Sequence, residues 1–260
     1  MRGRIKAVFF DIDGTLVSFA THTVPNSARC AIEQLRQQGV KVFIATGRLM
    51  KHVSVVDDID VDGYITVNGG YCITAQGEVI YERYFDPETV ERVIALSEKY
   101  GFDLTVMTHE GMYVNCMGSR VEKIASMIHI MPKVADLRAI ASSQPVVQMC
   151  PYISANLEPE IMSQLPDCVG SRWIETFMDI NIKGVDKSLG VNEVMRYYGL
   201  TMGEAMAFGD GGNDLPMVRD AAVGVAMGNA CEELKKAADY VTTSVDEDGV
   251  ERALKYFGLI

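Results

Sequence analysis

The stretch "VFFDIDGTLVS", residues 8–18, places two aspartates directly after an apolar run that is typical of a buried strand. Asp11 and Asp13 are two residues apart, and a tight loop closed by Gly14 can direct both carboxyl groups into one cavity. Two like charges in a partly dry site repel each other unless a cation or a proton lies between them. The motif therefore favours a nucleophile and a proton carrier beside a cation, with a plain turn and two solvated aspartates as the alternative.

A second pair of carboxylates follows another apolar run, in "FGDGGND", residues 208–214. Asp210 and Asp214 flank a glycine-rich bend there, and carboxylates that converge from distant parts of a chain suit a hard cation such as Mg²⁺. A calcium-binding loop is disfavoured because the EF-hand spacing is absent. A helix N-terminus capped by Asn213 stays open as the structural alternative.

The segment "FIATGR", residues 43–48, has the features of a phosphate site between a strand and a helix. A helix is predicted for residues 47–56, and its first amide groups and positive end favour an anion. Thr46 offers a hydroxyl, and Gly47 lets a ligand approach the backbone closely. Thr46 can equally be a helix cap, and Arg48 either binds substrate or is solvated.

Lys187 lies near the start of another predicted helix, in "KGVDKSLG", residues 183–190. A cation is disfavoured at this end of a helix, so an ion pair with a pocket carboxylate such as Asp214, together with contact to a phosphate, would explain its presence. A solvated surface lysine is the commoner outcome, and Lys183 competes for the same role.

Strand-like and helical segments alternate in the first and last parts of the chain, which predicts an α/β fold with a parallel sheet. The segment between them mixes short strands and helices. We therefore expect a core of residues 1–83 and 183–260 with an inserted α+β cap domain of residues 84–182. Because ligands of such sheets bind at the carboxyl ends of the strands, the three polar clusters should meet at one edge, with the insert placed as a lid.

The composition excludes several other classes of function. A formal net charge of −11 argues against nucleic acid and anionic membrane surfaces as partners. The apolar runs are too short to cross a bilayer and the N-terminus lacks a signal-peptide pattern, so we expect a cytoplasmic protein. The six cysteines are scattered without zinc-binding spacing, and the four histidines show no ligand pairing.

Taken in order, "DIDGT", "ATGR", Lys187 and "GDGGND" resemble the four motifs of the haloacid dehalogenase (HAD) superfamily of phosphatases. The segment "VGVAMGNACEELKKAADYVTTSVDEDGV", residues 223–250, is similar to the Cof-type branch, as is an insert of this size, a C2-type cap. The resemblance covers nearly the whole chain and is weakest across the insert. It implies a Rossmann-like core with a cap that sets substrate specificity.

The resemblance also implies roles for individual residues. Asp11 would attack phosphorus, and Asp13 would protonate the leaving alkoxide and then deprotonate the hydrolytic water. Mg²⁺ would be held by Asp11, the backbone carbonyl of Asp13, and Asp210. The phosphoryl oxygens would be bound by Thr46, Gly47, Lys187 and Asn213, with Asp214 orienting Lys187 and Arg48 as a further candidate for substrate contact.

These features predict a Mg²⁺-dependent phosphatase, a monomer or small homo-oligomer, that hydrolyses small phosphorylated metabolites through an aspartyl-phosphate, with sugar phosphates as the expected class. A sugar phosphomutase of the same fold is one alternative. A non-catalytic phospho-accepting or sensor domain is another, although such a domain has no need of a general acid at Asp13. Within the insert, the candidates for substrate contact are Arg172, Trp173, Glu175 and Phe177.

Overall fold

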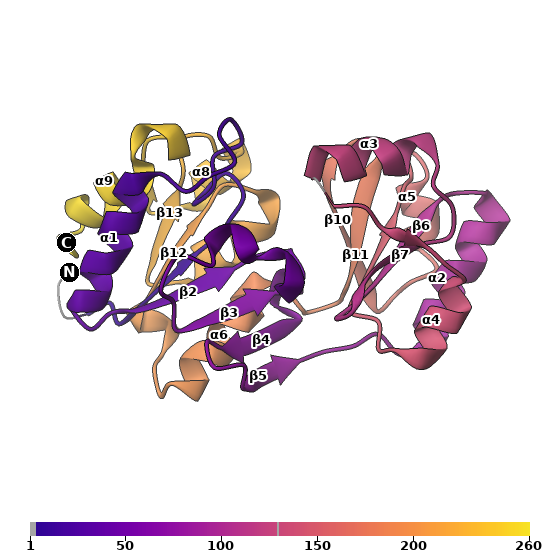
Figure 1. Ribbon diagram of the computed structural model, residues 1–260, viewed down its shortest axis with the longest axis horizontal. Helices are drawn as coiled ribbons and strands as arrows, with labels where there is room; N and C mark the ends of the chain where they lie inside the picture. The colour runs from indigo at the N-terminus through magenta and orange to yellow at the C-terminus, as the bar shows by residue number, and fades with distance from the viewer. Residues whose placement is uncertain (1–3, 129) are drawn as a thin grey trace. The chain divides into compact units, whose positions relative to one another are not determined.

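The computed structural model describes residues 4–128 and 130–260, with Trp173 described by its backbone alone. The chain divides into two compact units (Figure 1). The core unit comprises Met1–Glu82 and Val185–Ile260, and the inserted unit comprises Arg83–Gly184. The role of the inserted unit as a cap stays a prediction.

A parallel sheet forms the centre of the core unit. Its strand order is β14-β13-β12-β1-β2-β3-β4-β5, with parallel pairing from β14 to β3 and antiparallel pairing of β4 and β5 at the edge. This order places β1 between β2 and β12, where sheets of this kind form their ligand crevice. The strands are β1 (Ala7–Phe10), β2 (Lys41–Ala45), β3 (Gly63–Thr66), β4 (Tyr71–Thr74), β5 (Val79–Glu82), β12 (Ala205–Gly209), β13 (Val223–Ala226) and β14 (Tyr240–Val241).

Helices cover both faces of this sheet, as Figure 1 shows. Val8 and Phe10 of β1 belong to the apolar cluster on the face of α1 and α9, whereas Ala7 and Phe9 belong to the opposite cluster. A strand covered on both faces is apolar at every position, which explains the uninterrupted run before Asp11. The helices are α1 (Asn26–Gln37) and α9 (Gly249–Tyr256) on the first face, and α6 (Lys187–Tyr197), α7 (Leu215–Asp220) and α8 (Glu232–Ala237) on the second.

The helix predicted for residues 47–56 is wrong. The chain forms two short 3₁₀ turns there, η1 (Met50–His52) and η2 (Ser54–Val56). Val53, one of three β-branched valines in the segment, separates them with non-helical backbone angles (φ −91°, ψ 2°), and no side chain caps either turn. The argument for a phosphate at a helix N-terminus therefore does not apply to this loop.

The inserted unit is an α+β structure around a six-stranded sheet of order β10-β11-β9-β6-β7-β8. The sheet is antiparallel except for the pair β7–β8, and its apolar face packs against α2, α4 and α5. Its strands are β6 (Leu104–Thr108), β7 (Gly111–Val114), β8 (Lys133–Val134), β9 (Gln148–Pro151), β10 (Cys168–Ile174) and β11 (Phe177–Ile182). Its helices are α2 (Pro87–Tyr100), α3 (Ser119–Ile128), α4 (Leu137–Ser143) and α5 (Glu158–Met162).

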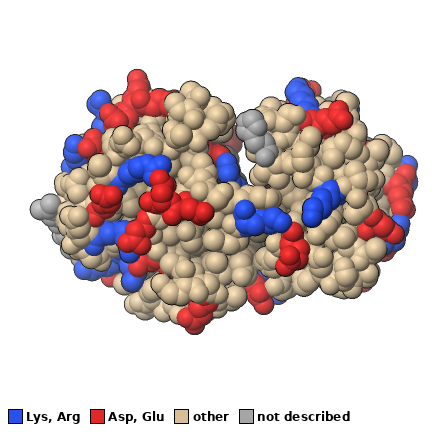
Figure 2. Space-filling view, in the orientation of Figure 1, with Lys and Arg blue, Asp and Glu red and all other residues tan. Residues whose placement is uncertain are grey.

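On the face shown in Figure 2, acidic and basic side chains are interspersed over both units. Among the described residues, no helix is both long enough and apolar enough to span a membrane.

Candidate active site

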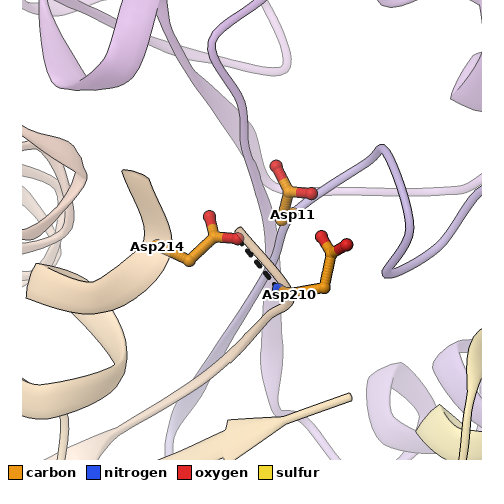
Figure 3. A group of neighbouring side chains, drawn as sticks. All are labelled: Asp11, Asp210 and Asp214. Carbon is orange, nitrogen blue, oxygen red and sulfur yellow. Dashed lines mark hydrogen bonds between the residues drawn. The ribbon is translucent and has the colours of Figure 1, made fainter. Parts of the chain in front are cut away.

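Parallel pairing of β1 with β12 brings the predicted carboxylates together. Phe10 and Phe208 are paired in the two strands, and the N–H of Asp11 donates to the carbonyl of Phe208 (3.1 Å). Asp11 and Asp210 consequently leave the sheet at the same edge. One carboxylate oxygen from each of Asp11, Asp210 and Asp214 lies within 4.8 Å of the other two (Figure 3).

Lys187, the first residue of α6, is completely buried beside this cluster. Its Nζ donates to Asp11 Oδ1 (2.6 Å) and to Asp214 Oδ1 (2.5 Å), so the predicted ion pair with Asp214 is present. Lys183, its competitor in the sequence, is exposed. The start of α6 lies so close to the turn after β3 that a Cβ on Gly69 (φ +95°) would come 1.9 Å from the carbonyl oxygen of Asp186, and only glycine fits there.

The cluster holds more negative charge than one lysine compensates. Burial, with repulsion from Asp214, raises the pKa of Asp11 well above its ordinary value, although Lys187 acts in the opposite direction. The same two causes raise the pKa of Asp210 to about 7. Burial by itself lowers the pKa of Lys187, but the carboxylates of Asp11 and Asp214 outweigh it and raise that pKa. A further cation would relieve the repulsion that remains.

The carboxylate of Asp214 already accepts hydrogen bonds from other groups. Its Oδ2 accepts from the N–H of Asp210 at 2.9 Å (Figure 3) and from the N–H of Gly211, also at 2.9 Å, and its Oδ1 accepts from Lys187. Asp11 and Asp210 are therefore the carboxylates best placed to hold a metal ion. Two carboxylates completed by water suit a hard divalent cation, so the residues present fit a metal.

Asp13 lies outside this cluster and pairs with Arg48 instead. The guanidinium donates from Nη2 to Asp13 Oδ1 (2.6 Å) and from Nε to Oδ2 (2.8 Å), in a bidentate arrangement. Its Nη1 donates to the carbonyl of His52 (3.0 Å). The sequence offered Arg48 as a candidate for substrate contact. In the structure its side chain binds Asp13, the predicted proton carrier.

The remaining predicted phosphate ligands meet around Asn68, to which the sequence assigned no role as a ligand. Asn213 Nδ2 donates to Asn68 Oδ1 (3.0 Å), and a Cβ on Gly47 would lie 3.0 Å from the same oxygen. Thr46 is buried, and its hydroxyl accepts from the N–H of Arg48 (3.2 Å). The signal for Asn68 was "NGG", residues 68–70, whose two glycines mark a tight turn directly after a strand.

Asn229 is a second residue that sequence reasoning missed. Its side chain contacts Gly14, Asp210 and the N–H of Val245. The only sequence signal was its place in the "MGNA" segment, residues 227–230. That segment contributed to the family resemblance but indicated no chemical role for Asn229.

The four candidates in the inserted unit occupy different environments. Arg172 forms an ion pair with Glu158 (2.9 Å) and donates to the backbone carbonyl of Glu175. Phe177 is buried, with its ring 5.3 Å from that of Tyr152, and the Glu175 side chain is exposed. The side chain of Trp173 lies outside the described part of the chain. Their contact with substrate stays a prediction.

The fold is that of an α/β enzyme, and its candidate active site combines carboxylates, a buried lysine and residues that fit a cation. The model of the haloacid dehalogenase-like hydrolases matches residues 8–254. YkrA of Bacillus subtilis is 31% identical over 98% of both chains. The chain belongs to the haloacid dehalogenase-like hydrolases, in the Cof-type phosphatase branch, which confirms the predicted family and fold class.

Solved structures and other relatives show the same relationship. The phosphatase BT1666 from Bacteroides thetaiotaomicron is 36% identical, with a TM-score of 0.95 over 100% of this chain and 98% of that one. The HAD subclass IIB sugar phosphatase BT4131 is 41% identical, with a TM-score of 0.91 over 98% of this chain and 100% of that one. The 5-amino-6-(5-phospho-D-ribitylamino)uracil phosphatase YcsE of Bacillus subtilis is 28% identical over 98% of this chain and 96% of its own.

Proposed function

We propose that this protein is a Mg²⁺-dependent phosphatase of small phosphorylated metabolites and that Asp11 is its nucleophile. The observation that carries the proposal is the convergence of three carboxylates, two of which, Asp11 and Asp214, share the buried Nζ of Lys187. A carboxylate is repelled by the phosphate dianion that it attacks, so the reaction requires positive charge in a water-poor site. Lys187 and a divalent ion at Asp11 and Asp210 would supply that charge.

The chain's own residues then take the following parts. A carboxylate oxygen of Asp11 attacks phosphorus, and the bond between phosphorus and the ester oxygen breaks. Asp13 gives a proton to the leaving oxygen and later takes one from the water that hydrolyses the aspartyl-phosphate. The phosphoryl oxygens are bound by Thr46, Gly47, Lys187 and Asn213, while Asp214 holds the Nζ of Lys187 in place.

Asp11, Asp210 and the backbone carbonyl of Asp13 are the proposed metal ligands. When bound, Mg²⁺ offsets the charge of the phosphoryl oxygens as a Lewis acid. Mg²⁺ is proposed over other cations because it is bound through one or two carboxylates, keeps several waters and commonly serves phosphate chemistry.

The proposed substrate class rests on the relatives. BT4131 is a sugar phosphatase at 41% identity, and the substrate named for YcsE carries a phosphorylated ribityl chain. We therefore propose phosphate monoesters of sugars and related polyhydroxylated compounds. Arg172, Trp173, Glu175 and Phe177 remain the candidates for their selection.

The test is the release of phosphate from a panel of sugar phosphates and other monoesters, with and without Mg²⁺. The wild type should turn over at least one sugar phosphate only with Mg²⁺. Asp11→Asn should lose roughly 10⁴-fold in kcat or more while keeping its circular dichroism spectrum. Asp246→Asn, at an exposed aspartate of the core unit, is the matched control and should stay at the wild-type rate. Turnover by Asp11→Asn would contradict the nucleophile assignment.

The two alternative functions predict different products in the same assay. A phosphomutase would form an isomeric hexose phosphate faster than free phosphate, which chromatography of the products detects. A phospho-accepting domain would accumulate a stable acyl phosphate without turnover, which mass spectrometry of the intact chain detects, and a non-catalytic sensor would show neither the modification nor turnover. Steady release of phosphate with neither product supports the phosphatase.

A further inference from the structure

Asn229 lies between β13 and α8 and joins three parts of the core unit through one side chain. Its Nδ2 donates to the carbonyl oxygen of Gly14 (2.8 Å) and to Asp210 Oδ2 (3.2 Å). Its Oδ1 accepts from the N–H of Val245 (3.0 Å). The Val245 N–H requires the amide oxygen on its own side, so the two donors of the amide point at Gly14 and Asp210.

The backbone around Asn229 is held against the same loop. The N–H of Met227 donates to the carbonyl of Gly209 (3.0 Å), and the N–H of Cys231 donates to the carbonyl of Asp210 (2.9 Å). Gly14 (φ +83°) approaches Asp210 so closely that a Cβ would lie 2.2 Å from Oδ2. The amide of Asn229 therefore sits where the loop that carries Asp13 meets the loop that carries Asp210.

We infer that Asn229 is a positioning residue that keeps the Asp210 carboxylate directed toward Asp11 for metal binding, an inference that rests on the metal site of the proposed function. Asp210 is crowded by the negative charges of Asp11 and Asp214, and this repulsion favours rotation of its carboxylate away from them. A charge-assisted hydrogen bond from Asn229 opposes that rotation. Because Val245 anchors the amide at its other end, Asn229 cannot follow Asp210 if that side chain moves.

The expected effect is on metal affinity rather than on the chemical step. Groups that hydrogen-bond to metal ligands typically change metal affinity by 10- to 100-fold. The Asn229 side chain is exposed, so water can replace part of its contribution, and about a 10-fold loss of Mg²⁺ affinity is expected for Asn229→Ala.

The experiment measures binding of Mg²⁺ alone to the full chain, without substrate. The unfolding midpoint is recorded over a series of Mg²⁺ concentrations, and the concentration dependence gives the dissociation constant. The variants are Asn229→Ala, Asn229→Leu, which keeps the branched side-chain shape but has no donors, and Asn192→Ala as the control at an exposed asparagine of α6. Both Asn229 variants should bind Mg²⁺ about 10-fold more weakly, and the control should bind like the wild type.

The outcomes separate the inference from the function on which it rests. If the wild type binds Mg²⁺ and both Asn229 variants bind it equally well, the positioning role is overturned and the proposed function stands. If the wild type shows no Mg²⁺ binding, both the proposed metal site and the positioning role of Asn229 are contradicted. A lower midpoint without Mg²⁺ but an unchanged dissociation constant shows a purely structural role and also overturns the inference. Asn229→Leu provides the comparison should the alanine variant not fold.

Discussion

Asp11 is buried in the core unit and Asp179 is half-buried in the inserted unit, and the surroundings of the two carboxylates differ. In the core unit, Asp11 shares the ammonium group of Lys187 with Asp214, and Asp210 lies beside them. In the inserted unit, Asp179 of β11 accepts a hydrogen bond from the neutral thiol of Cys150 in the adjacent strand β9 (3.3 Å).

The difference shows how a reactive cluster is distinguished from a structural polar contact. Burial raises the pKa of both Asp11 and Asp179, the latter to about 6, so a shifted carboxyl group is not by itself the mark of an active site. What marks the core unit is concentrated charge: several carboxylates from distant segments around one buried lysine. In the inserted unit, desolvation favours the protonated form of Asp179, although the hydrogen bond from Cys150 acts in the opposite direction, and no second carboxylate is clustered with it among the described residues.

Removing the buried cation is the most severe test of this contrast. Lys187→Met should lower kcat by roughly 10³-fold, because the phosphoryl oxygens lose a positive donor. It should also lower the free energy of unfolding by roughly 3–5 kcal/mol, because the buried carboxylates of Asp11 and Asp214 lose the cation that compensates their charge. Steady-state kinetics and urea denaturation measure the two effects. Lys183→Met, at the exposed lysine, is the matched control, and equal behaviour of the two variants would contradict the contrast.

Replacing Asp13, the proposed proton carrier, should have the next largest effect. Asp13→Asn should slow both ester cleavage and hydrolysis of the aspartyl-phosphate, each by about 10²- to 10⁴-fold, because one carboxyl group serves as acid and then as base. Rapid-quench kinetics separates the two steps. Slowing of ester cleavage alone would show that the hydrolytic water has another base.

Arg48 allows a finer test, because it touches Asp13 and was also a candidate for substrate contact. If its bidentate pair positions Asp13, Arg48→Ala should lower kcat for alkyl phosphates at least ~10-fold more than for 4-nitrophenyl phosphate, whose leaving group needs no proton. If Arg48 acts on the substrate phosphate, KM should rise equally for both esters. Comparing kcat and KM for the two substrates decides between these roles.

The smallest expected effect belongs to Asp179 and concerns stability alone. Its pKa of about 6 in the folded chain exceeds the ordinary value of 3.8, so the folded state binds the proton more tightly than the unfolded state does. The stability that this provides is complete below pH 4 and is lost as the pH rises toward 6 and above. Asp179→Asn cannot titrate and should lack this loss, which we expect to be on the order of 1–2 kcal/mol.

Urea denaturation of the wild type and Asp179→Asn between pH 4 and pH 7 measures this difference. Asp167→Asn, at an exposed aspartate of the same unit, should keep the wild-type pH dependence. Parallel curves for wild type and Asp179→Asn would show that the pKa of the Asp179 carboxyl group does not change on folding. That result would contradict the part of the contrast that concerns the inserted unit.

The alternation of strands and helices was readable from the sequence because it depends on local patterns. β1, β2 and β12 are buried on both faces and read as apolar runs, and each ends where a polar cluster begins. The helix predicted for residues 47–56 failed for a local reason as well, because β-branched residues and the lack of a cap favour short turns there.

The sequence by itself determined the family, the fold class and the set of acidic groups at the strand ends, since these follow from motif order and from the period of apolar residues. The family resemblance selected Lys187 over Lys183, but only the tertiary structure decided that its Nζ contacts both Asp11 and Asp214, that Arg48 binds Asp13, and that Asn229 contacts Asp210. The physical reason is distance along the chain. Lys187 lies 176 residues from Asp11, and such contacts exist only once β1 pairs with its neighbours and the loops at their ends are brought together.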